Sequence, residues 1–395
     1  MRKTDAFRRA AALMAALSIT VSLAAPAFAG TYYIDDGDIT ITKDENGQTV
    51  KQGNNAAEKI GADEEIIITT HKEATTTLES DLEGPAAEDS GFGPVVEDNY
   101  QPAAPAQPED AEEPKDADQP ESAEEPEDAD RQAQPQQAAL TAADDPATST
   151  PANGFWGNTI TVINKVANTV LNLTLRDVKI DVSDNRTYGD ETGKAALSVQ
   201  GKGSVEIELD GKNELKSGYK RAGLEKTSEG TLTLKDDKKK AGSLTATGGK
   251  FGAGIGGGNG GSGKNITITG GTVNAKGGLE GAGIGGGTGG SGENITINGG
   301  TVEANGGLFG AGIGGGLNGV GKNITINGGT VEATGGDNGG AGIGGGDSGS
   351  GEAITITGGT VNAAGGERGA GIGGGSWGSG SNVTVSGAAQ VTAIA

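Results

Sequence analysis

The 395-residue sequence contains no cysteine, and His71 is its only histidine. Without cysteine the chain has no disulfide framework, no thiolate metal site and no cysteine nucleophile. Histidine-dependent catalysis would have to use His71 alone. We therefore expect no catalytic residues, no metal ligand set and no cofactor, and the sequence favours a structural or binding protein over an enzyme.

Aromatic and basic side chains are also scarce. Aromatic residues make up 3% of the sequence, too few for a large aromatic core, and 53 acidic side chains outnumber 30 basic ones, for a net charge of −23. Because nucleic acids and anionic membrane surfaces attract basic proteins, this balance argues against both as partners.

The first 29 residues resemble an export signal. Residues 2–9 hold four basic side chains, residues 10–23 are apolar, and residues 27–29 form a small-x-small cleavage pattern. The sequence therefore predicts a signal peptide over residues 1–29 and a secreted, extracellular protein, free or associated with the cell surface. No later stretch is apolar enough to cross a bilayer, so we expect no membrane insertion after cleavage.

A proline-rich acidic stretch divides the remaining chain. Residues 84–151 contain 11 of the 12 prolines and 18 acidic residues against two basic ones. Such a composition buries too little apolar surface to offset its ordering entropy. We predict a disordered linker over residues 84–153, between an N-terminal β segment (30–83) and a second region (154–395). A partner-binding or calcium-buffering tract is the alternative.

Strand patterns occur on both sides of this linker, and no stretch after residue 29 shows a sustained helical period. The runs combine alternating apolar residues with Gly, Asp and Asn at their ends. They cover residues 38–42, 65–70, 159–163, 171–182 (with an irregular step at 176–177), 205–209 and 231–234. The pattern predicts an all-β protein.

A five-fold repeat fills residues 248–395. The motif Gly-Ala-Gly-Ile-Gly-Gly-Gly recurs every 29 or 30 residues, each time followed by two short strand patterns; it begins at Gly252, Gly281, Gly310, Gly340 and Gly369. A unit of this size cannot close a core of its own, but stacked units bury a shared one. We predict a parallel β-helix, or solenoid, of about 29 residues per coil. Its inward ladders would start at Ile255, Ile266, Ile268 and Val273.

Asparagine recurs at one position of the repeat, at Asn265, Asn294, Asn323 and Asn382. Each begins an Asn-x-Thr glycosylation pattern. In stacked coils, the same residues would form a ladder of hydrogen-bonded amides, which is the interpretation we favour.

The framework of the repeat is constant, whereas the residues just before and after the glycine motif vary. In a solenoid such positions line up along one edge, where binding sites usually lie. Phe251, Phe309 and Trp377 would stack on sugar rings, and Arg368 would bind a carboxylate. These four residues are our candidate carbohydrate-binding residues; tolerated variation in surface loops is the alternative.

Three other chemistries have weaker support. Asp181, Asp184 and Asp190 would form a single calcium site or a solvated acidic loop. Glu303 and Glu332, one coil apart, are the only acids at strand positions of the repeats and would be the pair of a polysaccharide lyase-like enzyme. Rows of outward threonines, starting at Thr267, resemble ice-binding faces, although strand propensity alone favours threonine there.

The glycine motif followed by Asn-Ile-Thr-Ile-Thr-Gly-Gly-Thr-Val resembles secreted bacterial surface proteins described as carbohydrate-binding-domain-containing proteins of gut Gram-positive bacteria. The resemblance covers residues 31–52 and 158–395. It implies a right-handed parallel β-helix outside the cell that binds polysaccharides, acidic plant or host polymers among them. It leaves the ligand and the mode of surface attachment open.

From these observations we expect a non-catalytic extracellular polysaccharide-binding or adhesive module. A structural stalk without a ligand is the alternative, followed by a lyase-like enzyme and an ice-binding surface. Because the last repeat ends on a strand pattern at Ala395 with no capping sequence, we also expect edge-to-edge self-association there, or a longer parent protein.

Overall fold

A computed structural model describes residues 30–61, 64–71, 154–183, 192–238 and 241–395. The predicted signal peptide (1–29) and linker (84–153) lie outside the described residues. Every described residue belongs to one compact unit. Residues 30–71 therefore share a unit with the second region.

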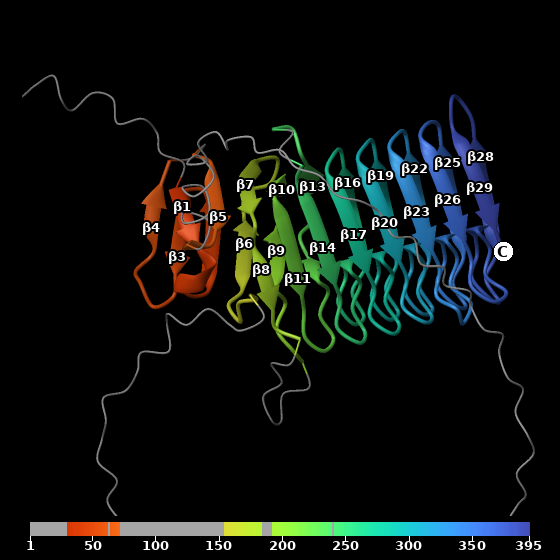
Figure 1. Ribbon diagram of the computed structural model, residues 1–395, viewed down its shortest axis with the longest axis horizontal. Coiled ribbons are helices and arrows are strands. Elements are labelled where there is room, and N and C mark those ends of the chain that lie inside the picture. Colours follow the sequence, from red (N-terminus) through yellow and green to blue (C-terminus); the bar gives the residue numbers. More distant parts are fainter. Residues whose placement is uncertain (1–29, 62–63, 72–153, 184–191, 239–240) are drawn as a thin grey trace, which may run out of the picture. The chain divides into compact units, whose positions relative to one another are not determined.

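The strands form three long sheets, here called A, B and C (Figure 1). Sheet A contains β1 (Gly30–Tyr33), β5 (Ile66–Thr69), β7 (Val170–Arg176), β10 (Ser204–Asp210), β13 (Leu232–Lys235), β16 (Gly263–Ile268), β19 (Gly292–Ile297), β22 (Gly321–Ile326), β25 (Gly351–Ile356) and β28 (Gly380–Val385). Sheet C contains β8 (Lys179–Asp181), β11 (Lys212–Lys216), β14 (Ser243–Thr247), β17 (Thr272–Lys276), β20 (Thr301–Asn305), β23 (Thr330–Thr334), β26 (Thr360–Ala364) and β29 (Gln390–Ile394).

Sheet B combines short parallel strands with one antiparallel end. It contains β2 (Ile39–Asp44), β3 (Gly47–Gln52), β4 (Glu58–Ile60), β6 (Ile160–Asn164), β9 (Leu197–Gly201), β12 (Leu224–Lys226), β15 (Ile255–Gly256), β18 (Ile284–Gly285), β21 (Ile313–Gly314), β24 (Ile343–Gly344) and β27 (Ile372–Gly373). Among the described strands, only β2–β3 and β3–β4 pair antiparallel. A short 3₁₀ helix, η1 (Ile34–Asp36), joins β1 to β2.

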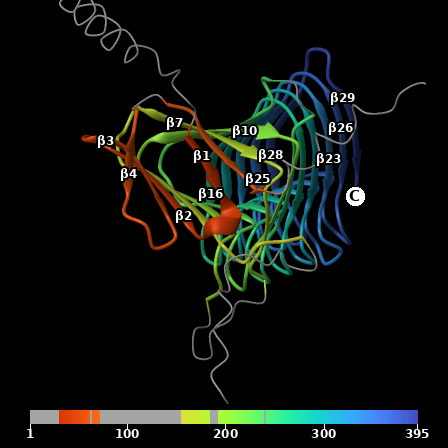
Figure 2. The same ribbon diagram turned by 60° about the vertical axis from the view of Figure 1, so that its left-hand side comes forward.

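From β6 onward each coil adds one strand to sheets B, A and C in turn. Coil 1 is β6-β7-β8 and coil 8 is β27-β28-β29, and each strand pairs in parallel with the same strand of the next coil. The N-terminal segment continues this stack, because β2 pairs with β6 and β5 pairs with β7. The predicted all-β parallel β-helix is confirmed, and Figure 2 shows the coils stacked one behind the other.

The core consists of the predicted aliphatic ladders. Ile266 aligns with Ile295, and Val273 with Val302. The ladder isoleucines of coils 4–7 on sheets A and B are fully buried. Because β-branched side chains pack well on a pleated surface, a thin core can be built without aromatic residues. In coil 8 the inward Val383 and Val385 are 43% and 51% exposed.

Glycine is required where the backbones of successive coils touch. A Cβ on Gly281 would lie 2.0 Å from the carbonyl oxygen of Gly252 in the coil before, a distance that no side chain tolerates. The constancy of the glycine motif therefore reflects close stacking of backbone on backbone.

The predicted amide ladder is confirmed on sheet A. Asn294 Nδ2 donates to Asn265 Oδ1 (2.9 Å), and Asn323 Nδ2 donates to Asn294 Oδ1 (3.1 Å). These residues have φ angles of 53–56°. Since asparagine tolerates this left-handed conformation better than most residues, backbone geometry and amide stacking favour the same residue. Ala353 takes the same conformation (φ 53°) without an amide.

One predicted strand run was wrong in detail. Residues 171–182 are two strands in different sheets, β7 in sheet A and β8 in sheet C. The chain turns between them at Asp177, whose φ is 51°. The irregular step in the apolar pattern is therefore a corner of the coil.

The corner from sheet B to sheet A differs in length between coils. Leu224 aligns with Ile255 and Leu232 with Ile266, so this corner spans 8 positions in coil 3 (224 to 232) and 11 in coil 4 (255 to 266). Coil 2 is as short as coil 3, because Leu197 aligns with Leu224 and Val205 with Leu232. The long corner of coil 4, residues 257–265, therefore stands out as a ledge above coil 3.

Hydrophobicity gives no sign of a bilayer span. The described part of the chain holds no helix with the length and apolar character that crossing a membrane would need.

Candidate functional site

The variable positions lie along one edge of the solenoid, on the two loops that flank the short strands of sheet B. We call this surface the variable edge. The loop after each strand hydrogen-bonds to the loop before the strand of the preceding coil: Thr288 N donates to Phe251 O (3.0 Å), and Asp347 N donates to Phe309 O (2.8 Å). Both variable segments therefore meet on the same surface.

The four predicted binding residues all lie on the variable edge, but they do not form one cluster. Phe251 is in coil 4 and Phe309 in coil 6, about 9–10 Å apart at the spacing of β-strands. Both phenylalanines are partly buried, whereas Arg368 and Trp377 of coil 8 are exposed. The role of the four residues in binding stays a prediction.

Trp377 is the most prominent side chain on the edge. It is 86% exposed and has a φ of 63°. Gly260, Gly289, Asn318 and Ser348 hold the matching conformation in coils 4–7. A bulky residue in this left-handed region is strained, so an aromatic ring is presented here against the local preference of the backbone.

The structure adds a partner for Phe251 that the sequence pattern missed. The rings of Tyr219 and Phe251 lie edge to face, with their centroids 5.2 Å apart. Lys220 Nζ lies 5.4 Å from the centroid of the Tyr219 ring, and Lys250 Nζ lies 5.2 Å from that of Phe251. These four residues form what we call the aromatic–basic cluster. Tyr219 belongs to coil 3, which lacks the glycine motif, so the repeat gave no reason to include it.

Local charge is a sequence signal that would have located this cluster. Residues 212–276 contain twelve lysines and arginines and five aspartates and glutamates, in a chain whose net charge is −23. The segment therefore carries +7 and reverses the overall charge. The segment runs from β11 of coil 2 to β17 of coil 4 and includes the aromatic–basic cluster.

Two buried ionisable residues lie on β12, shortly after Tyr219 and Lys220 of the cluster. Glu225 is 4% exposed, accepts a hydrogen bond from Ala222 N (3.2 Å), and lies 3.2 Å from Arg221 Nη1. Burial raises the pKa of Glu225, although Arg221 and the amide oppose this shift. Lys226 is 2% exposed, and burial lowers its pKa to about 8. A charged lysine ammonium is thus held inside the fold.

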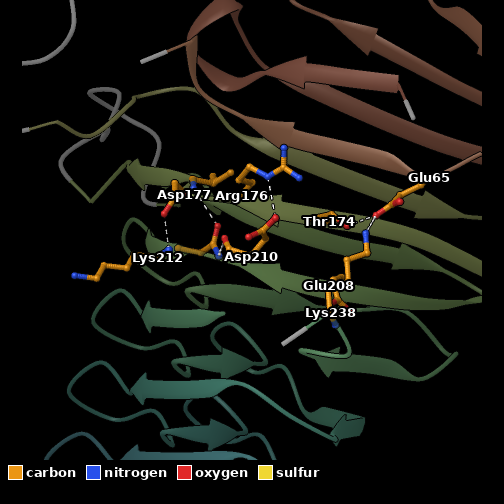
Figure 3. A network of polar contacts seen from close by, with 10 residues as sticks. Glu65, Thr174, Arg176, Asp177, Glu208, Asp210, Lys212 and Lys238 are labelled. Carbon is orange, nitrogen blue, oxygen red and sulfur yellow. Dashed lines mark hydrogen bonds and ion pairs between the residues drawn. The ribbon is translucent and has the colours of Figure 1, made fainter. Parts of the chain in front are cut away.

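A second polar cluster lies on the outer face of sheet A (Figure 3). Glu65 accepts hydrogen bonds from Thr174 (2.5 Å) and from Lys238, and Lys235 Nζ lies 2.8 Å from Glu206. These residues line a shallow hollow of about 230 Å³. Burial raises the pKa of Glu65, but the hydrogen bonds from Lys238 and Thr174 outweigh it and leave the pKa below its usual value.

A general acid needs a carboxyl group that stays protonated near neutral pH, so Glu65 does not suit that role. Lys235 does not suit the role of a general base either, because its hydrogen bond to Glu206 raises its pKa. The cluster is therefore better suited to joining strands than to acid–base chemistry. The other acidic pair, Glu303 and Glu332, lies side by side on β20 and β23, and Glu303 accepts hydrogen bonds from Asn274 and Asn305.

Among the described residues, one group of side chains could ligate a metal. Asp35, Asp36 and His71 offer ligand atoms within 4.8 Å of one another, and His71 Nδ1 lies 2.9 Å from Asp35. At the predicted calcium cluster, Asp184 and Asp190 lie outside the described residues. Asp181 accepts hydrogen bonds from Lys216 (3.2 Å) and Ser183 (2.6 Å).

Comparison with known proteins supports the fold and leaves the ligand open. The family described as Beta helix repeat matches residues 240–259, 266–291, 295–317, 324–347 and 354–376, which lie mostly in coils 4–8. No curated protein and no solved structure matches the chain. Together with the parallel stacking of coils 1–8, the family match shows a β-helix fold.

Proposed function

We propose that this chain is a non-catalytic extracellular module that binds an acidic polysaccharide along the variable edge. The observation that carries the proposal is the aromatic–basic cluster, with Tyr219 and Phe251 in contact and a lysine beside each ring. Aromatic side chains provide a flat apolar contact for a sugar ring. Lysines add attraction for carboxylate or sulfate groups on the polymer.

The charge distribution favours an acidic ligand over a neutral one. A protein with a net charge of −23 repels polyanions as a whole, yet Lys220 and Lys250 place basic groups beside the two rings of the cluster on the exposed edge. Because opposite potentials guide partners to each other, these lysines give a polyanion one favourable approach. The edge also runs across successive coils, so an extended polymer would contact several of them, including Phe309 and Trp377.

The test compares aromatic pairs on the same edge. Binding of the purified chain to polygalacturonate, sulfated dextran and neutral galactan is measured at two salt concentrations, with the double variant Tyr219→Ala/Phe251→Ala beside Phe309→Ala/Trp377→Ala. We expect retention on an acidic polymer that falls with salt and is lost in the first variant. Retention unchanged in the first variant, from folded protein, contradicts the assignment of the cluster.

A structural stalk without a ligand is the second candidate. It is favoured by coils 4–7, in which identical buried ladders and glycine contacts repeat in register and leave little room for deformation. The same binding panel separates the two candidates. A folded chain that is retained on no polysaccharide supports the stalk.

A further inference from the structure

A hollow of about 390 Å³ opens beneath the ledge formed by residues 257–265. It is lined by Lys226, Thr227, Ser228 and Glu229 of coil 3 and by Gly257, Gly258, Gly261, Ser262, Lys264 and Asn265 of coil 4. The hollow exists because the corner of coil 3 is three positions shorter than that of coil 4. The ledge therefore has no equivalent loop beneath it.

The missing loop leaves backbone donors without acceptors. In coils 5–8 the amide equivalent to that of Gly258 donates to the coil before it, as Gly287 N does to Gly261 O (3.0 Å) and Gly316 N does to Gly290 O (3.1 Å). Gly258 N has no such acceptor among the described residues, because coil 3 lacks the carbonyl that would supply it.

The same holds for Ser262. Ser291 N in coil 5 donates to Ser262 Oγ (3.1 Å), and Ser379 N in coil 8 donates to Ser350 Oγ (3.2 Å). Coil 3 has no serine to accept from Ser262 N, which has no acceptor within the described part of the chain. Two amides of the ledge thus end their ladders at the hollow.

Side chains of coil 3 add further donors from below. Lys226 is 98% buried, and in the described structure its ammonium group donates to one acceptor, Ser228 O (2.7 Å). Two of its three N–H groups therefore remain available. Ser228 is 93% buried, and its hydroxyl has no partner among the described residues. Buried groups of this kind are costly unless they find a partner.

Two carboxylates lie near the hollow. Glu229 is exposed at its rim, and Glu225, which is 4% exposed, lies against Gly258 and pairs with Arg221 (3.2 Å). Lys264, also at the rim, lies 3.0 Å from Glu293 of the next coil. A buried ammonium with spare N–H groups, an unpaired hydroxyl and two unpaired amides is a suitable environment for an anionic oxygen group.

We propose that this hollow binds the carboxylate of a uronic acid unit in the polysaccharide, with Lys226 as its counter-ion. The choice of a sugar acid rests on the function proposed above: the ledge is also bonded to the aromatic–basic cluster, since Asn259 N donates to Lys220 O (2.9 Å). A ring stacked on the cluster would place a neighbouring carboxylate near the ledge.

The first experiment follows the Lys226 side chain by NMR while the full chain is titrated with galacturonate, galactose or sulfate. Galacturonate is expected to raise the pKa of Lys226 and galactose to leave it unchanged, because only an anion stabilises the ammonium form. No change with galacturonate overturns the proposal. A shift with sulfate as large as that with galacturonate overturns the assignment to a carboxylate.

Variants provide the second measurement. Lys226→Met keeps the length of the side chain and removes its charge, and Ser228→Ala removes the hydroxyl. We expect the first to weaken galacturonate binding at least about tenfold, the scale of one charged hydrogen bond. Lys322→Met, at the position equivalent to Lys264 but two coils further on, should leave binding unchanged.

This result can be separated from that of the proposed function. If the cluster binds polymer but no carboxylate enters the hollow, Lys226→Met retains full preference for polygalacturonate over galactan, and the further proposal fails alone. If galacturonate binds at Lys226 but no polymer is retained, the hollow stands as an anion site and the polysaccharide function fails.

Discussion

Lys238 contacts the carboxylate of Glu65, which lies 173 positions earlier in the chain (Figure 3). The contact arises because the corner from sheet A to sheet C is longest in coil 3: Leu232 to Leu244 spans 12 positions, whereas Ile266 to Val273 of coil 4 spans 7. The extra residues carry Lys238 across coils 2 and 1 toward β5. The contact ties the N-terminal segment to the coils that follow the linker region.

Removing this contact should loosen the N-terminal segment. We expect Glu65→Gln to increase hydrogen exchange of β5 amides at neutral pH, by an amount equivalent to less than about 1 kcal/mol, because both side chains are substantially exposed and solvent screens them. Since the folded pKa of Glu65 lies below its usual value, its stabilisation is present above pH 4.5 and is lost as the pH falls further.

The control for this prediction is Lys322→Met, which removes another surface ion pair, that of Lys322 with Glu352 (3.4 Å), far from β5. It should leave exchange in β5 unchanged. Equal exchange in Glu65→Gln and the unaltered protein would contradict the role of the contact.

Ala353→Asn should stabilise the solenoid. Ala353 has a φ of 53°, and its neighbours in the ladder, Asn323 and Asn382, have the same φ. An asparagine would relieve backbone strain of about 1 kcal/mol and restore an amide between them. We expect a higher melting temperature for Ala353→Asn, and a smaller rise for Ala353→Gly, which relieves strain without adding the amide. A lower melting temperature for both variants would show that Ala353 is not strained.

Gly281→Ala should be strongly destabilising, by more than about 3 kcal/mol, because its Cβ would lie 2.0 Å from Gly252 O and neither backbone can move without disturbing the ladder. Gly157→Ala is the matched control, since a Cβ at Gly157 would meet nothing within 4 Å. Chemical denaturation should show a change within about 0.5 kcal/mol for this control. Similar stabilities of the two variants would be inconsistent with backbone-on-backbone packing.

The buried ammonium of Lys226 should make stability depend on alkaline pH. Its pKa is about 8 in the folded protein and 10.5 ordinarily, so the unfolded state binds more protons between these values. The contribution of Lys226 to the free energy of unfolding therefore rises with pH from about 8 to 10.5.

Lys226→Met should remove this slope and be more stable at pH 7 by on the order of 1–3 kcal/mol. The measurement is denaturant unfolding of both proteins at several pH values in the absence of ligand. Lys264 and Glu229 are present in both proteins. The difference between the two free energies of unfolding therefore reports on Lys226 alone. A constant difference across pH 7–11 would show that Lys226 is not desolvated.

Self-association at the last coil remains a prediction. Val383, Val385 and Ile394 of coil 8 are 43%, 51% and 60% exposed, which gives an apolar surface that a second copy would cover. Sedimentation of the chain at increasing concentration is the direct measurement.

The repeat allowed the fold to be predicted because identical residues had to stack. Ile266 and Ile295 occupy the same position 29 residues apart, and a buried ladder is the arrangement that satisfies both. The same logic predicted the amide ladder from Asn265 to Asn323. It did not extend to the corner at Asp177, because a left-handed turn in a run of alternating apolar residues leaves only a one-residue irregularity in the pattern.

The candidate site was predicted only in part. Phe251 was recognised because it varies within a constant framework, whereas Tyr219 lies in a coil without the motif and was missed. Its proximity to Phe251 depends on the stacking of coil 3 on coil 4. The charge of residues 212–276 was present in the sequence, but its meaning depends on which of these side chains share a surface.

The sequence by itself determined the all-β class, the parallel coils and the aliphatic ladders, because these depend on regular local patterns that each coil repeats. Only the tertiary structure decided where the repetition breaks: the pairing of residues 30–69 with coil 1, the contact of Lys238 with Glu65, and the ledge above Lys226. The physical reason is that unpaired donors and buried charges arise where neighbouring coils differ in length. Such a difference becomes visible only when the coils are aligned in space.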